Sequence, residues 1–250
     1  MNWVEDFYSK QEEWLGVYTS DVNDYHRKKA RTFELPAGAA PKSVLELGAG
    51  GGQVAFATAE LGYSVTAIEL LERPALLAKS LSDKITSHSM RVIQDDFYSV
   101  QLNESFDIVC YWDGFGIGED MDQVRLLRRA EQWLKSGGIV LLDIYSPWYW
   151  SKVAGTEMTI DTVKRRYEFI AKDSRMIDHW WMIGKEEQNV AQSLRCYSTT
   201  DLKLLLREPG LCLVEEEIVP SGAVNYAEGT YQEKEILEGC MQYPVKLVKR

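Results

Sequence analysis

A glycine-rich loop joins the first apolar run of the chain to a helical pattern. The apolar run is Ser43–Leu47, the loop is Gly48–Gly52, and a helix is expected over Gln53–Leu61. Glycines at a strand-to-helix turn let the backbone approach a ligand that a Cβ atom would exclude. The loop therefore predicts a βα unit with a ligand at the carboxyl end of its strand.

The alternation of short apolar runs with amphipathic helices continues to about residue 145. The later parallel strands are expected at Ser64–Glu69, Met90–Ile93, Phe106–Tyr111 and Ile139–Tyr145. Their nearly continuous apolar character is typical of strands covered by helices on both faces. Two further strands are expected at Leu211–Val219 and, antiparallel, at Met241–Lys249. The sequence thus predicts an α/β fold with a seven-stranded, mostly parallel, doubly wound sheet.

A helical N-terminal cap, residues 1–40, is expected before this core. Large apolar side chains recur at helical spacing near the start of the chain. A second helix is expected from Ser20–Asp21 to about Phe33, and Pro36 and Pro41 then break the chain.

The βα rhythm stops after the core, residues 41–145, and residues 146–197 have a different pattern. Runs rich in β-forming residues, separated by polar turns, occur at Arg166–Ala171, Met176–Ile183 and Ala191–Tyr197. We expect them to form an antiparallel insertion over one edge of the core. Residues 198–250 then supply a C-terminal helix and strands, and the whole chain is expected to be a single domain.

The composition limits the kinds of molecule that the chain is expected to bind. The chain has 28 Lys and Arg against 38 Asp and Glu, a net charge of −10, which disfavours nucleic acid because phosphates would be repelled. No stretch approaches the roughly 20 apolar residues that a membrane helix needs. Four scattered cysteines without a CxxC pair predict neither a zinc site nor a disulfide scaffold. We expect a cytoplasmic monomer or homodimer that binds no metal.

Two carboxylates accompany the glycine loop. Glu69 ends the second strand, where a carboxylate can accept hydrogen bonds from both hydroxyls of a ribose. A dinucleotide site would need a third glycine where Gln53 stands. Glu46, two residues before Gly48, disfavours a pyrophosphate and suits an ammonium group. A ligand with a ribose, a cationic amine and no phosphate is expected, and S-adenosylmethionine meets that description.

Five segments in order resemble the class I S-adenosylmethionine-dependent methyltransferases over about residues 40–220. They are Glu46–Gly52, Glu69, Gln94–Tyr98, Phe106–Tyr111 and Leu134–Gly138. The resemblance implies a Rossmann-like methyltransferase fold and an enzyme that uses S-adenosylmethionine. It implies cofactor contacts from Glu46, Gly48, Ala49, Gly50, Glu69, Leu70, Asp95, Asp96, Phe97 and Tyr111.

Some of these contacts have alternatives. By the resemblance Asp96 accepts a hydrogen bond from the adenine amino group, but Asp95 stands beside it. Leu70 packs either on the adenine or in the core. Glu46 could instead cap nearby backbone N–H groups. Gly51 and Gly52 could be simple turn residues.

The methyl acceptor is less constrained. The residues after the fourth strand, Tyr111–Gly114, lack the Pro-Pro motif of adenine or glutamine methyltransferases, and no Pro-Cys nucleophile follows. We expect an O or N nucleophile of a small molecule, bound by Tyr25, Trp112, Tyr145, Arg195 and Tyr197. His179 or His26 is the candidate general base. The alternatives are that His179 packs within the insertion sheet and that His26 lies on a solvated helix face. Arg195 faces either an acidic group of the acceptor or solvent.

Other functions stay open at this stage. Asp113 and Asp143 lie near the Mg²⁺ positions of catechol-type enzymes, but Ile144 follows Asp143 where those enzymes have Asn. A protein side chain as acceptor, or a cofactor-binding sensor without catalysis, is an alternative. A hydride-transferring enzyme is disfavoured because no Tyr-x-x-x-Lys pattern stands at a suitable position.

Overall fold

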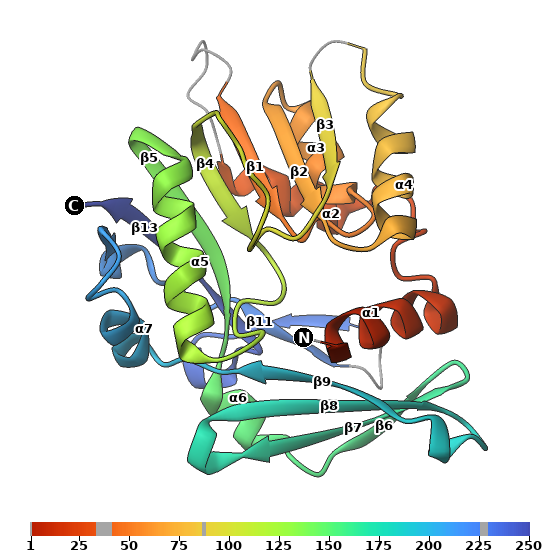
Figure 1. Ribbon diagram of the computed structural model, residues 1–250. Helices are drawn as coiled ribbons and strands as arrows, with labels where there is room; N and C mark the ends of the chain where they lie inside the picture. The colour runs from red at the N-terminus through yellow and green to blue at the C-terminus, as the bar shows by residue number, and fades with distance from the viewer. Residues whose placement is uncertain (1, 34–41, 87–88, 226–229) are drawn as a thin grey trace.

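The computed structural model describes residues 2–33, 42–86, 89–225 and 230–250, and a large twisted sheet lies at its centre (Figure 1). Its strand order is β12-β11-β13-β5-β4-β1-β2-β3, with β10 paired to β13. The five parallel strands are β1 (Ser43–Leu47), β2 (Ser64–Glu69), β3 (Met90–Gln94), β4 (Phe106–Tyr111) and β5 (Leu134–Tyr145). The predicted α/β fold with a mainly parallel sheet is confirmed.

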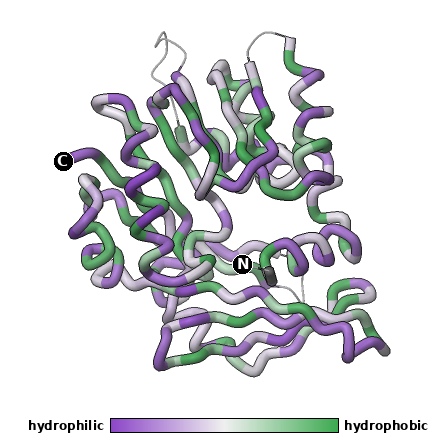
Figure 2. Tube along the Cα trace, viewed as in Figure 1, coloured by the Kyte–Doolittle hydropathy of each residue, from purple (hydrophilic) through white to green (hydrophobic). Residues whose placement is uncertain are grey.

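Helices cover both faces of the sheet. The first face packs on α5 (Asp120–Trp133) and α7 (Thr199–Leu205), which contribute Leu127 and Leu202 to the larger apolar core. The other face packs on α3 (Gln53–Glu60) and α4 (Glu72–Ser82), together with Phe33. Figure 2 shows the hydrophobic character concentrated along the central strands. The sheet is therefore doubly wound, and the loops at the carboxyl ends of its strands are left for a ligand.

The C-terminal part departs from the prediction. Within the described residues the sheet has nine strands instead of seven, because β11 (Gly222–Asn225) and β12 (Thr230–Glu233) add a hairpin. The expected strand over Leu211–Val219 ends early as β10 (Leu211–Leu213), where Glu215–Glu217 form a 3-10 turn. The antiparallel last strand is present as β13 (Gln242–Lys249).

The insertion forms the expected antiparallel sheet. Its strands are β6 (Glu157–Ile160), β7 (Val163–Ile170), β8 (Arg175–Met182) and β9 (Val190–Arg195), after the short helix α6 (Pro147–Lys152). This sheet is joined to the loop after β4 by a bridge between Ile117 and Leu194. It lies beyond the carboxyl ends of the parallel strands, below them in Figure 1.

The two helices of the N-terminal segment pack in different places, the first on the antiparallel sheet and the second on α3. Helix α1 (Asn2–Leu15) lies on the antiparallel sheet, where the rings of Phe7 and Trp180 are 5.6 Å apart. Helix α2 (Asp24–Ala30) starts later than the expected Ser20–Asp21, because the side chain of Asn23 accepts the first N–H groups and caps it. The expected break at Pro36 and Pro41 lies outside the described residues. No helix of the described part is long and apolar enough to cross a membrane.

Candidate active site

Two tyrosines flank the glycine loop. Gly48 is exposed with φ +61°, and a Cβ atom built on it would lie 3.1 Å from the ring of Tyr111. Gly50 has φ +55°, and its Cβ would lie 2.8 Å from the ring of Tyr18. Both conformations favour glycine and both positions lack room for a side chain. The loop therefore presents bare backbone between two aromatic rings.

Glu69 ties the end of β2 to this loop. Its side chain is buried, Oε2 accepts from the N–H of Gly50 at 2.8 Å, and Oε1 accepts from the N–H of Leu71 at 2.9 Å. Burial raises the pKa of Glu69, and the backbone N–H groups partly oppose that rise. The half-buried Leu70 lies between these contacts in the chain. A fixed carboxylate thus stands where the sequence places the ribose-binding acid.

The segment after α1 lies directly on the loop. The side chain of Gln53 donates to the carbonyls of Tyr18, at 2.8 Å, and Ser20, at 3.1 Å. Glu12, which is buried, accepts from the N–H of Tyr18 at 2.9 Å. A Cβ on Gly51 would clash with the carbonyl oxygen of Tyr18. Gly51 is therefore required by the close approach of another chain segment.

The turn after β3 stands beside Glu69. The N–H of Asp95 donates to the Glu69 carbonyl at 3.0 Å. Asp95 accepts from the N–H of Asp96, and Asp96 from that of Tyr98, both at 2.7 Å. The ring of Phe97 lies 5.4 Å from that of Tyr111. The turn is near the expected adenine position, and the choice between Asp95 and Asp96 stays a prediction.

Glu46 lies inside the sheet face that carries α2. It is 2% exposed, and its Oε2 has no hydrogen-bond partner among the described residues. Burial raises the pKa of Glu46 to about 8, against the opposing charge of Lys29. Lys29 itself forms an ion pair with Asp143 and lies 4.7 Å from the centroid of the Trp112 ring. The unpaired oxygen of Glu46 is the kind of group that a ligand N–H would satisfy.

Asp113, directly after β4, is held from two other strands. Its Oδ1 accepts from the hydroxyl of Tyr145 on β5 and, at 3.1 Å, from the side-chain amide of Gln242 on β13. The side chain is open to solvent, yet the surrounding protein raises its pKa through lost hydration. Burial raises the pKa of Tyr8 and of Tyr111, and the charge of Asp113 contributes to both rises.

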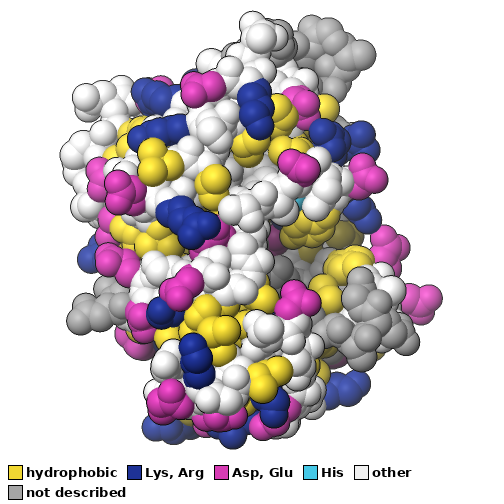
Figure 3. All heavy atoms as spheres, turned by 90° about the vertical axis from the view of Figure 1, so that its right-hand side faces the viewer, with side chains coloured by type: hydrophobic (Ala, Val, Ile, Leu, Met, Phe, Trp, Pro, Cys, Tyr) yellow, Lys and Arg dark blue, Asp and Glu magenta, His cyan; other side chains and the backbone are white. Residues whose placement is uncertain are grey.

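We call the group formed by Tyr8, Tyr18, Tyr111, Asp113 and Tyr145 the Asp113 site. The phenol of Tyr8 is oriented by a 3.3 Å hydrogen bond to Gln192 of the antiparallel sheet. Figure 3 shows the molecule from the right-hand side of Figure 1, where the surface is hollowed beside hydrophobic side chains. Sequence reasoning considered Asp113 only for a metal, and its place after the fourth strand was the available signal.

The two histidines predicted as candidate bases have other partners. His26 accepts the N–H of Asn23 on Nδ1 at 3.1 Å, which completes the cap of α2, and burial lowers its pKa. His179 pairs with Glu168 at 3.3 Å on the face of β8 opposite to the buried Asp178. The structure brings neither ring into contact with the residues of the Asp113 site that it describes.

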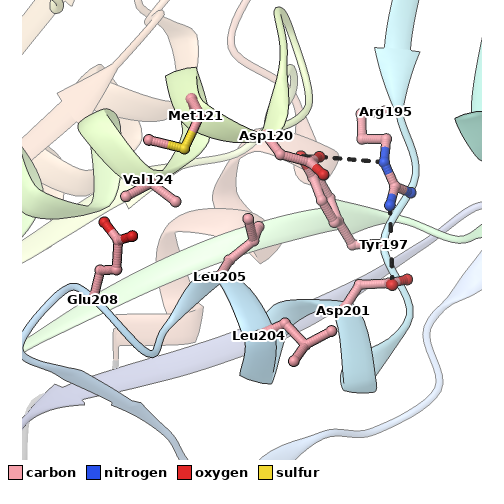
Figure 4. Close-up of a pocket in the computed structure, with 9 residues that line it drawn as sticks. All are labelled: Asp120, Met121, Val124, Arg195, Tyr197, Asp201, Leu204, Leu205 and Glu208. Atoms are coloured by element: carbon pink, nitrogen blue, oxygen red, sulfur yellow. Dashed lines mark hydrogen bonds and ion pairs between the residues drawn. The ribbon is translucent and has the colours of Figure 1, made fainter.

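The residues predicted to bind the acceptor lie in several different parts of the structure. Tyr145 belongs to the Asp113 site, Trp112 lies beneath Lys29, and Tyr25 is 64% exposed on α2. Arg195 and Tyr197 line a separate pocket of about 230 Å³ between α5 and α7 (Figure 4).

Ion pairs and a hydrogen bond link the polar residues of the pocket that Arg195 and Tyr197 line. The guanidinium of Arg195 pairs with Asp120 at 3.3 Å and with Asp201 at 3.9 Å, and the Tyr197 hydroxyl donates to Asp120 at 2.8 Å. None of the residues lining this pocket belongs to the glycine loop or to the Asp113 site.

The family described as a methyltransferase domain matches residues 19–216 of the chain. The cypemycin N-terminal methyltransferase of a Streptomyces species is 30% identical over 121 residues, which are 48% of this chain and 48% of that protein. The chain thus matches about half the length of this curated relative.

Two solved structures share the whole fold. The CcbJ methyltransferase from Streptomyces caelestis superposes with a TM-score of 0.71 at 20% identity, over 90% of this chain and 95% of its own. An S-adenosylmethionine-dependent methyltransferase from Clostridium acetobutylicum ATCC 824 gives 0.69 at 14% identity, over 98% of both chains. The chain belongs to the methyltransferase family, and the predicted class of S-adenosylmethionine-dependent methyltransferases is confirmed.

Proposed function

We propose that the chain transfers a methyl group from S-adenosylmethionine to an O or N nucleophile of a small molecule at the Asp113 site. The predicted cofactor residues fit this ligand. The bare backbone at Gly48 leaves room for an uncharged part of it, and the fixed carboxylate of Glu69 suits its ribose hydroxyls. The unpaired Oε2 of Glu46 suits its ammonium group. When bound, S-adenosylmethionine supplies an electrophilic methyl group whose bond to sulfur breaks as the bond to the acceptor forms.

The residues of the chain would mainly position the reactants. Glu69 would orient the ribose hydroxyls, and Glu46 would accept hydrogen bonds from the methionine ammonium group. Tyr18 and Tyr111, on the two sides of the loop, would exclude water from the reacting atoms. Alignment of this kind can supply a large part of the acceleration in a simple displacement.

The single observation that carries an acceptor site here is the placement of Asp113. Its carboxylate is fixed by Tyr145 and Gln242, and its charge acts on Tyr111, whose ring borders the glycine loop. A group at this position can accept a proton from the acceptor or stabilise charge that develops on it. In this proposal Asp113 takes the role that the sequence suggested for His26 or His179.

The experiment is a methyl-transfer assay with methyl-labelled donor against a panel of small amines and alcohols, using wild type, Asp113→Asn and His179→Gln. Asp113→Asn should lower kcat/KM by about 100-fold or more, a loss of roughly 3 kcal/mol of transition-state stabilisation. His179→Gln should stay within about twofold of wild type. An Asp113→Asn enzyme of full activity would place the acceptor elsewhere.

Binding of S-adenosylhomocysteine, measured calorimetrically on the same samples, shows whether a loss of activity reflects the acceptor side. Cofactor binding without transfer to any small molecule, but with transfer to a protein substrate, would favour a side-chain acceptor. Cofactor binding without any transfer would favour a sensor.

A further inference from the structure

The two oxygens of Asp113 are not equivalent. Both donors, the Tyr145 hydroxyl and the Gln242 amide, reach Oδ1. Oδ2 receives no hydrogen bond from the residues that the structure describes, and the side chain is open to solvent. The pairing of β13 with β5, which sets Gln242 opposite Tyr145, fixes this arrangement through the backbone. The carboxylate is thus anchored through one oxygen and available through the other.

The positive groups near Asp113 are already paired. The positive charges of Lys29 and Arg165 both lower the pKa of its carboxyl. Lys29 forms its ion pair with Asp143, and Arg165 holds Asp178 through Nε and Nη2. Asp143, whose charge interacts with Asp113, is itself the partner of Lys29. Around Oδ2 the described part of the chain therefore supplies a negative potential without a dedicated counter-ion.

The aromatic residues near Asp113 suit an organic cation. The side chains of Tyr8 and Tyr111 lie near enough to feel the charge of Asp113, and the Tyr145 hydroxyl contacts it directly. Tyrosine rings are among the groups that bind organic cations. A neutral hydroxyl would gain one hydrogen bond here and leave the carboxylate charge uncompensated. An ammonium group would gain that hydrogen bond and neutralise the charge as well.

We propose that the methyl acceptor is an amine, held by an N–H···O hydrogen bond to Oδ2 of Asp113. This rests on the proposed function and specifies its substrate class. The bound ammonium passes one proton to Oδ2, which frees the nitrogen lone pair. As the N–C bond forms and the C–S bond breaks, the positive charge passes from sulfur to nitrogen, and the product leaves as a methylated ammonium. The proton on Asp113 returns to solvent.

The test uses a pair of probes of the same shape, benzylamine, which is an ammonium ion at neutral pH, and benzyl alcohol. Each is titrated by NMR into the complex of the full chain with S-adenosylhomocysteine. Asp113→Asn is the informative variant, because its Oδ1 still accepts from Tyr145 and Gln242 while the charge is removed. Asp83→Asn, an exposed carboxylate at the end of α4, is the matched control for net charge.

We expect benzylammonium to bind wild type about tenfold or more tightly than benzyl alcohol, which corresponds to at least ~1.4 kcal/mol. Asp113→Asn should remove that preference, and Asp83→Asn should keep it. Equal binding of the two probes to wild type, an unchanged preference in Asp113→Asn, or no benzylammonium binding would overturn the amine assignment. Failure of S-adenosylhomocysteine to bind would instead overturn the proposed function.

Discussion

The backbone N–H of Gly50 donates a 2.8 Å hydrogen bond to Oε2 of Glu69, so the loop after β1 is joined to the end of β2. The same carboxylate holds the N–H of Leu71 through its other oxygen. A buried acid that fixes the backbone on both sides of a ligand position gives a preorganised site. The proposed cofactor end of the molecule is therefore built by neighbouring strands of the parallel sheet.

Adjacent lysines of α2 give a first test of the buried charges. Lys29 pairs with the buried Asp143, whereas Lys28 pairs with Glu233 at 3.2 Å and both of those side chains are largely exposed. Lys29→Met leaves a buried carboxylate without its cation and should lower the free energy of unfolding by about 3–5 kcal/mol. Lys28→Met should cost less than about 1 kcal/mol. Urea unfolding measures both, and equal losses would mean that the Lys29 pair is screened by solvent.

Glu46 gives a pH dependence with a defined sign. Its pKa is about 8 in the folded protein against an ordinary value of 4.5, so between these pH values the folded chain holds a proton that the unfolded chain has lost. The free energy of unfolding therefore falls as pH rises through this window, by as much as roughly 4 kcal/mol from this group. Glu46→Gln removes the contribution.

The measurement for Glu46 is urea unfolding of wild type and Glu46→Gln from pH 5 to pH 8, without cofactor. Relative to the variant, wild type should lose stability steadily as pH rises. Parallel curves would show that Glu46 is ionised throughout, with its charge balanced by Lys29.

Gly51 tests the contact between the N-terminal segment and the loop. Its Cβ position is filled by the carbonyl of Tyr18, so Gly51→Ala must displace that segment. We expect a loss of roughly 1–3 kcal/mol in stability, together with faster proteolysis after α1. Gly239→Ala, whose Cβ would meet only the flexible chain of Lys234 at 3.2 Å, should change stability by less than about 0.5 kcal/mol. Similar behaviour of the two variants would argue that the segment is loosely held.

The parallel core and the family were predictable because their signals are local. The glycine loop, Glu69 and the apolar runs each specify a strand, a turn or a helix start within a few residues. The hairpin of β11 and β12 was missed because Thr230–Glu233 is exposed throughout and has a single aromatic residue, Tyr231, and so has no alternating hydrophobic pattern. The start of α2 was misplaced because Ser20 and Asp21 compete with Asn23 as capping residues.

The residues of the proposed acceptor site were harder to predict from the sequence. Asp113 follows β4, whereas Tyr145 and Gln242 lie on β5 and β13, and their meeting depends on the register of β13 against β5. The pattern also gives no indication of which face of the antiparallel sheet is covered by α1. His179 therefore looked like a candidate base, although it lies on the face opposite to Asp178.

The most direct test of the account is a calorimetric titration of the chain with S-adenosylmethionine, S-adenosylhomocysteine and NAD, using wild type, Glu69→Ala and Glu72→Ala. Glu72 is an exposed acid three residues further along the chain, so it controls for charge. Both sulfur ligands should bind wild type, about tenfold or more weakly after Glu69→Ala, and unchanged after Glu72→Ala. Absence of binding, a preference for NAD, or indifference to Glu69→Ala would contradict the assignment of this site.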